Sequence, residues 1–165
     1  TIGVPPTAIA AGLHAYRGAE RRFQFKGEYN GAMIYDDYAH HPGELHVLLD
    51  TAKTLGYDRI ICAFQPHTYT RTKALFGDFV HELKRPDITL LAEIYAAREK
   101  NTIGISSKDI ADCIPGAIYC PTLADVTAKL KELARPGDLI LTVGAGDIYQ
   151  AGEALLQEPE AIKES

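Results

Sequence analysis

The sequence has no dense run of basic residues, no apolar run long enough to cross a membrane and no signal-peptide pattern. Its formal net charge is −5 at pH 7. A protein that binds nucleic acid usually carries a basic stripe, and a transmembrane helix needs about 20 consecutive apolar residues. We therefore expect neither a nucleic-acid partner nor a membrane partner.

Cysteine is scarce, and its arrangement is not that of a disulfide or zinc framework. The three cysteines, Cys62, Cys113 and Cys120, form an odd number without CxxC spacing. Cys62 lies in an apolar run, which is typical of a small core residue. We interpret all three as reduced thiols in a cytoplasmic protein, and we expect no metal site.

The chain has a single methionine, Met33, and begins with Thr1, which suggests a piece cut from a longer protein. Its 165 residues suffice for one domain, which at this size buries roughly 70% of the unfolded chain's surface. We expect one domain over residues 19–157. Residues 1–18, with a helix over 5–16, would be the end of a preceding unit, and 158–165 a frayed tail.

Hydrophobic periodicity predicts an alternation of strands and helices. Asn30-Gly31 joins two strand-like runs, 23–29 and 32–36, and indicates a β-hairpin. After the hairpin we predict strands over 59–64, 87–91, 117–119 and 139–143, and helices over 45–55, 75–83, 106–113, 123–133 and 148–156. The expected fold is α/β: a Rossmann-like, open, mostly parallel sheet with helices on both faces, to which the hairpin contributes an antiparallel edge strand.

The predicted topology selects four loops as candidates for ligand binding, because ligands of open parallel sheets lie beyond the carboxyl ends of the strands. These loops are 36–42, 65–72, 93–100 and 144–147. Three of the six histidines, His40, His41 and His67, lie in the first two loops. The sequence therefore predicts the site where these two loops meet.

The first loop, Asp36–Pro42, combines two carboxylates, a phenol and two imidazoles. Adjacent side chains on a regular element point to opposite sides, so His40 and His41 are poorly placed to share one metal ion. Two further interpretations stay open, namely capping of the following helix by a histidine and binding of a ligand.

The second loop, Gln65–Thr72, places Arg71 at the start of a predicted helix. Free backbone N–H groups there favour an anion, and a guanidinium beside them is a good receptor for carboxylate or phosphate. The alternative is an ordinary surface arginine. The fourth loop, Gly144–Asp147, lacks the third glycine of a dinucleotide fingerprint, and a tight turn capped by Asp147 explains it equally well. The chain has no Walker-type phosphate loop, so ATP would need its main phosphate site elsewhere.

Three strings, DDYAHHP at 36–42, FQPHTYTRT at 64–72 and GAGDI at 144–148, resemble the C-terminal domain of the Mur ligases. The resemblance runs from about Gly18 to Leu156. Arg21-Arg22-Phe23 resembles the junction with the central ATPase domain, whose last helix would be residues 1–18. Gln65-Pro66-His67 is most similar to members that join L-alanine to UDP-N-acetylmuramate.

The resemblance implies an ATP-dependent ligase that makes peptidoglycan precursors. ATP phosphorylates the muramoyl carboxylate, and the amine of alanine attacks the acyl phosphate. The phosphate loop and most of the magnesium site would lie in the central domain, so the isolated chain is expected to be inactive. The implied partners are the enzyme's own central and N-terminal domains, ATP with magnesium, L-alanine and UDP-N-acetylmuramate. A Mur-type ligase for another amino acid or peptide, and a non-catalytic binding module, are the alternatives.

The family pattern also assigns roles on the amino-acid side of the site. Tyr38 and His40 would line the alanine pocket, and His67 would stand near the incoming amine. His40 and His67 are thus the candidate catalytic groups. Arg71 would pair with the alanine carboxylate, as its position at a helix start already suggests.

On the nucleotide side, the resemblance implies that Arg22 reaches the ATP phosphates and that Asp37 accepts a hydrogen bond from the ribose. The chain departs from the pattern at one position, because many members carry arginine where this sequence has Thr68. Arg98 in the third loop is a candidate replacement for the missing cation.

Overall fold

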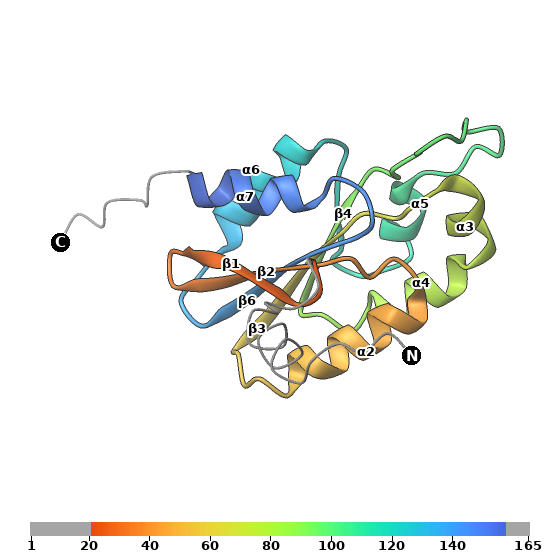
Figure 1. Cartoon of the computed structure of the whole chain (residues 1–165). Coiled ribbons are helices and arrows are strands. Elements are labelled where there is room, and N and C mark those ends of the chain that lie inside the picture. The colour runs from red at the N-terminus through yellow and green to blue at the C-terminus, as the bar shows by residue number, and fades with distance from the viewer. Residues whose placement is uncertain (1–20, 158–165) are drawn as a thin grey trace, which may run out of the picture.

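Six strands form one sheet in the order β1-β2-β6-β3-β4-β5 in the computed structural model, which describes residues 21–157 (Figure 1). The strands are β1 (Gln24–Tyr29), β2 (Ala32–Asp37), β3 (Arg59–Phe64), β4 (Ile88–Ala92), β5 (Ile118–Cys120) and β6 (Asp138–Val143). The helices are α2 (Pro42–Lys53), α3 (Tyr69–Ala74), α4 (Phe76–Glu82), α5 (Ser107–Ala111), α6 (Leu123–Leu133) and α7 (Tyr149–Gln157). The expected helix over 5–16, the unit 1–18 and the tail 158–165 lie outside the described residues.

The hairpin supplies the antiparallel edge of the sheet, as predicted. β1 pairs antiparallel with β2, and all the other neighbouring strands pair in parallel. The hairpin turns at Asn30 (φ 50°) and Gly31 (φ 77°), both in the left-handed region. Two such residues in succession define the turn whose twist matches a hairpin. The Rossmann-like, mostly parallel sheet is therefore confirmed.

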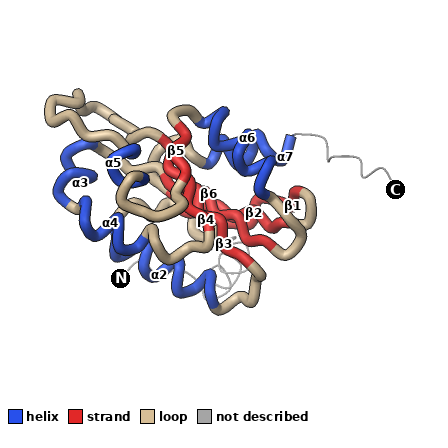
Figure 2. Tube along the Cα trace, turned by 180° about the vertical axis from the view of Figure 1, so that it is seen from behind, coloured by secondary structure: helices blue, strands red, loops and turns tan. Residues whose placement is uncertain are grey.

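Helices cover both faces of the sheet and divide the core into two layers (Figures 1 and 2). On one face, Ile60, Cys62 and Phe64 of β3 pack with residues of α2, α4 and α5. On the other face, Ile61 and Ala63 pack with residues of α6 and α7. A strand covered on both sides needs apolar residues at successive positions, which is why these strands show no polar alternation.

The predicted helix over 75–83 is in fact two helices, α3 and α4, which meet at Leu75 (φ −111°, ψ 22°). α3 has no apolar stripe, and its one buried residue is Thr72. Periodicity therefore detected only α4. The α2 helix begins at Pro42, earlier than predicted, because His41 and Glu44 form a capping box in front of its first apolar residue.

Cys62 and Cys120 are buried and Cys113 is exposed, and all three are free thiols. Burial raises the pKa of the Cys62 thiol to about 12, so it behaves as an inert core residue. Across residues 21–157, no helix is both long and apolar enough to span a membrane.

Candidate ligand site at the carboxyl edge of the sheet

The four predicted loops meet at one edge of the sheet, because they follow the adjacent parallel strands β2, β6, β3 and β4. Backbone hydrogen bonds join them beyond the strand ends. Gly144 N donates to Asp37 O (3.0 Å), and Gln65 N donates to Val143 O (3.0 Å). Tyr95 N donates to Pro66 O (2.9 Å), which ties the third loop to the second. The strand-end rule therefore located a single, connected surface.

Arg21, which the sequence did not single out, clamps two of these loops together. Its Nε donates to Asp36 Oδ2 (2.7 Å), and its two terminal nitrogens donate to Gly146 O (3.0 Å) and Gly144 O (2.6 Å). The guanidinium also lies near the rings of Tyr38 and Tyr149, at 5.0 and 4.7 Å from their centroids. Asp36 is 1% exposed, so this is a largely buried ion pair. The first aspartate of the loop thus has a structural partner.

Asp37 and Arg22, both predicted to contact the nucleotide, line one pocket of about 430 Å³. The carboxylate of Asp37 orders its surroundings, because Oδ2 accepts from Phe23 N (2.7 Å) and Oδ1 from Ala39 N (2.8 Å). Arg22 itself is exposed. The remaining lining residues are Phe23, Ala39, Gly43, Glu44, Val47, Leu48 and Thr51. The pocket is therefore an apolar hollow with one cation and one buried carboxylate at its border.

The two adjacent histidines have different tasks. His41 caps α2, since its Nδ1 accepts from Gly43 N (3.2 Å). Glu44 Oε2 accepts from the backbone N–H groups of both His40 (2.9 Å) and His41 (3.2 Å). The capping interpretation is thus correct for His41, while the His40 ring turns toward the second loop.

An aromatic and imidazole cluster occupies the junction of the first three loops. The His40 ring lies edge-on to Tyr38 (5.5 Å between centroids) and to His67 (6.0 Å). His67 in turn stacks on Tyr95 at 5.6 Å with an interplanar angle of 15°. The structure therefore brings three of the predicted amino-acid-side residues together, and it adds Tyr95, which the sequence analysis missed.

Two buried polar atoms in the second loop have no hydrogen-bond partner: His67 Nδ1 and Arg71 Nη1. Buried polar groups in native proteins are nearly always paired, so such orphans indicate a partner that the chain itself does not supply. Burial lowers the pKa of His67, and the nearby charges of Arg71 and His40 lower it further, against an opposing effect of Glu99. The protonated form of His67 is thus disfavoured relative to that of an exposed histidine.

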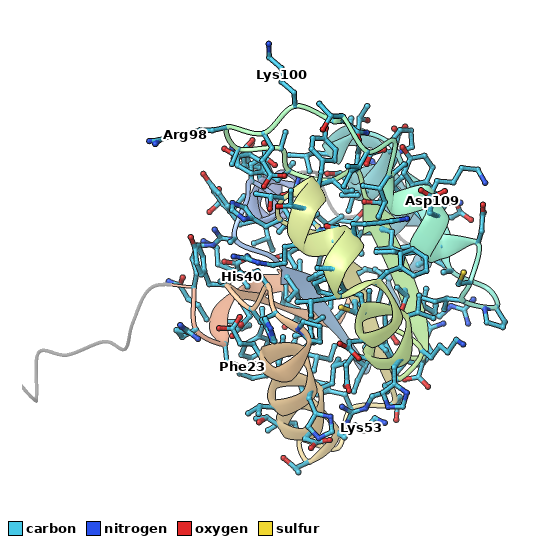
Figure 3. All side chains as sticks on the ribbon, turned by 90° about the vertical axis from the view of Figure 1, so that its right-hand side faces the viewer. Phe23, His40, Lys53, Arg98, Lys100 and Asp109 are labelled. Atoms are coloured by element: carbon cyan, nitrogen blue, oxygen red, sulfur yellow. The ribbon has the colours of Figure 1, made fainter. Side chains whose placement is uncertain are left out.

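The third loop contacts α3 through Glu99. Its carboxylate accepts from Thr70 N (2.9 Å) and Thr70 Oγ1 (2.5 Å), which caps the helix that carries Arg71. The neighbouring Arg98 is exposed, and its side chain extends away from the body of the domain, as that of Lys100 does (Figure 3). Thr68, at the start of α3, has φ 67°. A role for Arg98 as replacement cation stays a prediction.

The fourth loop is shaped by Gln65. Its Oε1 accepts from Asp147 N (3.0 Å) and Ile148 N (3.2 Å), and its Nε2 donates to Asp147 Oδ1 (2.8 Å). The amide of Gln65, reaching across from β3, thus satisfies the N–H groups that precede α7. In residues 21–157, no three His, Cys, Asp or Glu side chains gather as a possible metal site.

Comparison with known proteins agrees with this geometry. The family described as "Mur ligase, glutamate ligase domain" matches residues 21–146. The chain therefore belongs to the Mur ligase family, and it corresponds to the C-terminal domain of the ligases in that family.

Among curated relatives, the chain is 47% identical over 162 residues to a UDP-N-acetylmuramate–L-alanine ligase from Agathobacter rectalis, and the match covers 96% of this chain and 35% of that protein. Among solved structures, a UDP-N-acetylmuramate–alanine ligase from Thermotoga maritima matches with a TM-score of 0.68 at 26% identity, over 94% of this chain and 33% of that one. A murein peptide ligase from Psychrobacter arcticus matches with a TM-score of 0.72 at 24% identity, over 98% and 35%, and shows the fold. The chain thus spans about a third of the length of these relatives.

Proposed function

We propose that this chain is the amino-acid-presenting domain of an ATP-dependent ligase that joins L-alanine to UDP-N-acetylmuramate. One observation carries the proposal: buried side-chain nitrogens of His67, beside His40, and of Arg71, in the first turn of α3, have no hydrogen-bond partner. A free α-amino acid offers a carboxylate and an amine only two bonds apart. It therefore complements a guanidinium and an imidazole that lie close enough for their charges to interact.

In this proposal Arg71 binds the carboxylate of alanine, and His67 contacts its amine. Tyr38 and His40 form the adjacent wall. The amine attacks the acyl carbon of the activated muramoyl group, the bond from that carbon to the phosphate oxygen breaks, and the nitrogen loses a proton. The domain contributes mainly by holding the nucleophile in place, which converts an encounter in solution into a reaction between oriented groups.

For ATP, the proposal assigns the pocket of about 430 Å³ that Arg22 and Asp37 line. Its volume and apolar walls suit a nucleoside. Asp37 would accept a hydrogen bond from the ribose with a remaining lone pair, and exposed Arg22 would contact the phosphates. Magnesium and the main phosphate contacts are assigned to the central domain, because this chain has neither a phosphate loop nor a described cluster of metal ligands. Since the reaction consumes ATP, we place the enzyme in the cytoplasm.

The test is the release of ADP by the full-length protein that contains this chain. With UDP-N-acetylmuramate present, we expect L-alanine to stimulate release more than any other amino acid. Stimulation by a different amino acid or by a peptide would replace alanine with that substrate. If no amino acid stimulates release, the ligase proposal is wrong and a non-catalytic binding module is favoured.

A further inference from the structure

Tyr95 in the third loop contacts His67, the residue that the proposed function places next to the amine of alanine. The ring of Tyr95 stacks on the imidazole of His67, nearly parallel to it at 15°. The backbones of these two residues form an isolated parallel bridge, and Tyr95 N donates to Pro66 O (2.9 Å). This bridge lies beyond the ends of β3 and β4 and keeps their parallel direction, with a shift of one residue from the register of the strands. The stacked pair is therefore built on the sheet and does not depend on a loose loop contact.

Gly146 in the fourth loop provides the space for Tyr95. A Cβ atom on Gly146 would lie 2.6 Å from Cγ and 2.8 Å from Cβ of Tyr95, closer than real side chains approach. Tyr95 thus fits between the glycine and His67, while its outer surface leaves it 37% exposed. Three loops converge on the imidazole, with Tyr95 covering one ring face and His40 edge-on nearby.

We propose that Tyr95 is a positioning residue for the amine step: it fixes the ring plane of His67 and excludes water from one face of it. His67 can then accept the proton that the amine loses. In that step the C–N bond forms, the bond from the acyl carbon to the phosphate oxygen breaks, phosphate leaves, and one proton moves from nitrogen to the imidazole. The inference rests on the proposed function, since only a ligase needs this acceptor.

The charges around His67 explain why exclusion of water matters. Arg71 and His40 oppose protonation of the imidazole, and Glu99 favours it. Desolvation is the largest influence on the pKa of His67, and it disfavours the protonated form of the imidazole. Removing the Tyr95 ring leaves these charges in place and opens the imidazole to water. The pKa of His67 should then rise toward the value of about 6.5 for an exposed histidine.

The first experiment follows the His67 resonances by NMR during a pH titration of this chain. We expect Tyr95→Ala to raise the pKa of His67 measurably above that of the wild type. Tyr95→Phe, which keeps the stacked ring, should leave it unchanged. Ile103→Ala is the matched control, because Ile103 is 44% exposed and lies in the same connection between β4 and α5. Tyr95→Leu is a second variant that keeps bulk without the aromatic ring, should the alanine variant unfold.

The second experiment measures alanine-dependent ADP release by the full-length protein as a function of pH. Tyr95→Ala should lower kcat/KM for alanine about 10-fold and move the acidic limb of the profile to higher pH, and Tyr95→Phe should restore both. If Tyr95→Ala leaves the His67 titration unchanged, or if the active Tyr95→Ala enzyme has an unchanged pH profile, the role of Tyr95 is wrong. Either result would leave the proposed function standing. A wild-type protein that releases no ADP with alanine would instead overturn the proposed function.

Discussion

The Arg21 clamp should contribute a large share of the stability of the domain, although Arg21 lies at the very start of the described chain. Replacing it with alanine removes three hydrogen bonds, to Asp36, Gly144 and Gly146. Asp36 would remain buried with one side-chain donor, Thr142 Oγ1 at 2.9 Å. The substitution therefore leaves a buried carboxylate without its counter-charge.

The size of the effect follows from that unpaired charge. Removing one partner of a buried ion pair costs about 3–5 kcal/mol, and we expect the lower end here because Thr142 still donates to Asp36. For a chain of this size, about 3 kcal/mol corresponds to a decrease in Tm of about 6–12 °C. Because Asp36 is 1% exposed, added salt should change this difference little.

The assay is urea unfolding of the wild type, Arg21→Ala, Asp36→Asn and the double variant, which together form a double-mutant cycle. Arg22→Ala is the matched control, because the neighbouring arginine is exposed and should change the free energy of unfolding by no more than about 0.5 kcal/mol. We expect Asp36→Asn to recover part of the loss caused by Arg21→Ala. A loss below about 1 kcal/mol for Arg21→Ala, or equal losses at both arginines, would refute the reasoning.

Three further predictions concern the loops. In steady-state ADP release, Arg71→Ala should raise KM for alanine about 10- to 100-fold through lost charge-assisted hydrogen bonds. If Arg98 replaces the cation that is missing at Thr68, Arg98→Ala should raise KM for alanine as well, and an unchanged KM would contradict that role. Burial alone would raise the pKa of Glu93, but hydrogen bonds from Tyr119, Ile94, Ser106 and Ser107 lower it below the usual 4.5. The ionised Glu93 therefore stabilises the fold above about pH 4.5, and this stabilisation is lost as the pH falls. In a plot of the urea midpoint against pH, Glu93→Gln should flatten the acid side, and an unchanged slope there would contradict the argument. Gly146→Ala should destabilise the domain by about 1–3 kcal/mol in thermal unfolding, because the added Cβ would lie 2.3 Å from Gln65 Oε1. Gly77→Ala in α4 is the control and should be neutral or stabilising, because no atom lies within 4 Å of the added Cβ. Similar effects at both glycines would contradict the packing argument.

The features that the sequence predicted correctly are those encoded locally. Strands that are buried along their whole length, such as 139–143, and the Asn30-Gly31 turn carry their own signals, because burial on both faces and left-handed φ angles restrict the residue type directly. Strand ends then locate the loops. Arg71 could be placed at a helix start because a strand precedes it and the Leu75–Leu83 stripe follows.

The features that were missed depend on contacts between distant segments. α3 has no apolar stripe, and Glu99, 29 positions after Thr70, caps it. Arg21 differs from Arg22 only in the loops that it contacts, 123 and 125 positions away. No local pattern separates two adjacent arginines. The same holds for Tyr95, whose stacking on His67 depends on the register between β3 and β4 beyond their last paired residues.

Side chains of the first loop contribute to both proposed subsites, the nucleotide pocket and the amino-acid cluster. The residue at which β2 ends marks the change from one subsite to the other. Asp37 is the last strand residue and lines the pocket assigned to the nucleotide. Tyr38 and His40 follow the strand on the amino-acid side, where His40 lies edge-on to His67 and Tyr38 lies edge-on to His40. The segment from Asp37 to His40 therefore joins the two proposed subsites. Because Tyr38 N donates to Arg21 O (2.7 Å) and Phe23 N donates to Asp37 Oδ2, the segment that enters the domain is bonded to both sides of this division. We therefore expect a displacement of that segment to move the border of the pocket assigned to the nucleotide and the wall of the amino-acid cluster together, without contact between the two ligands.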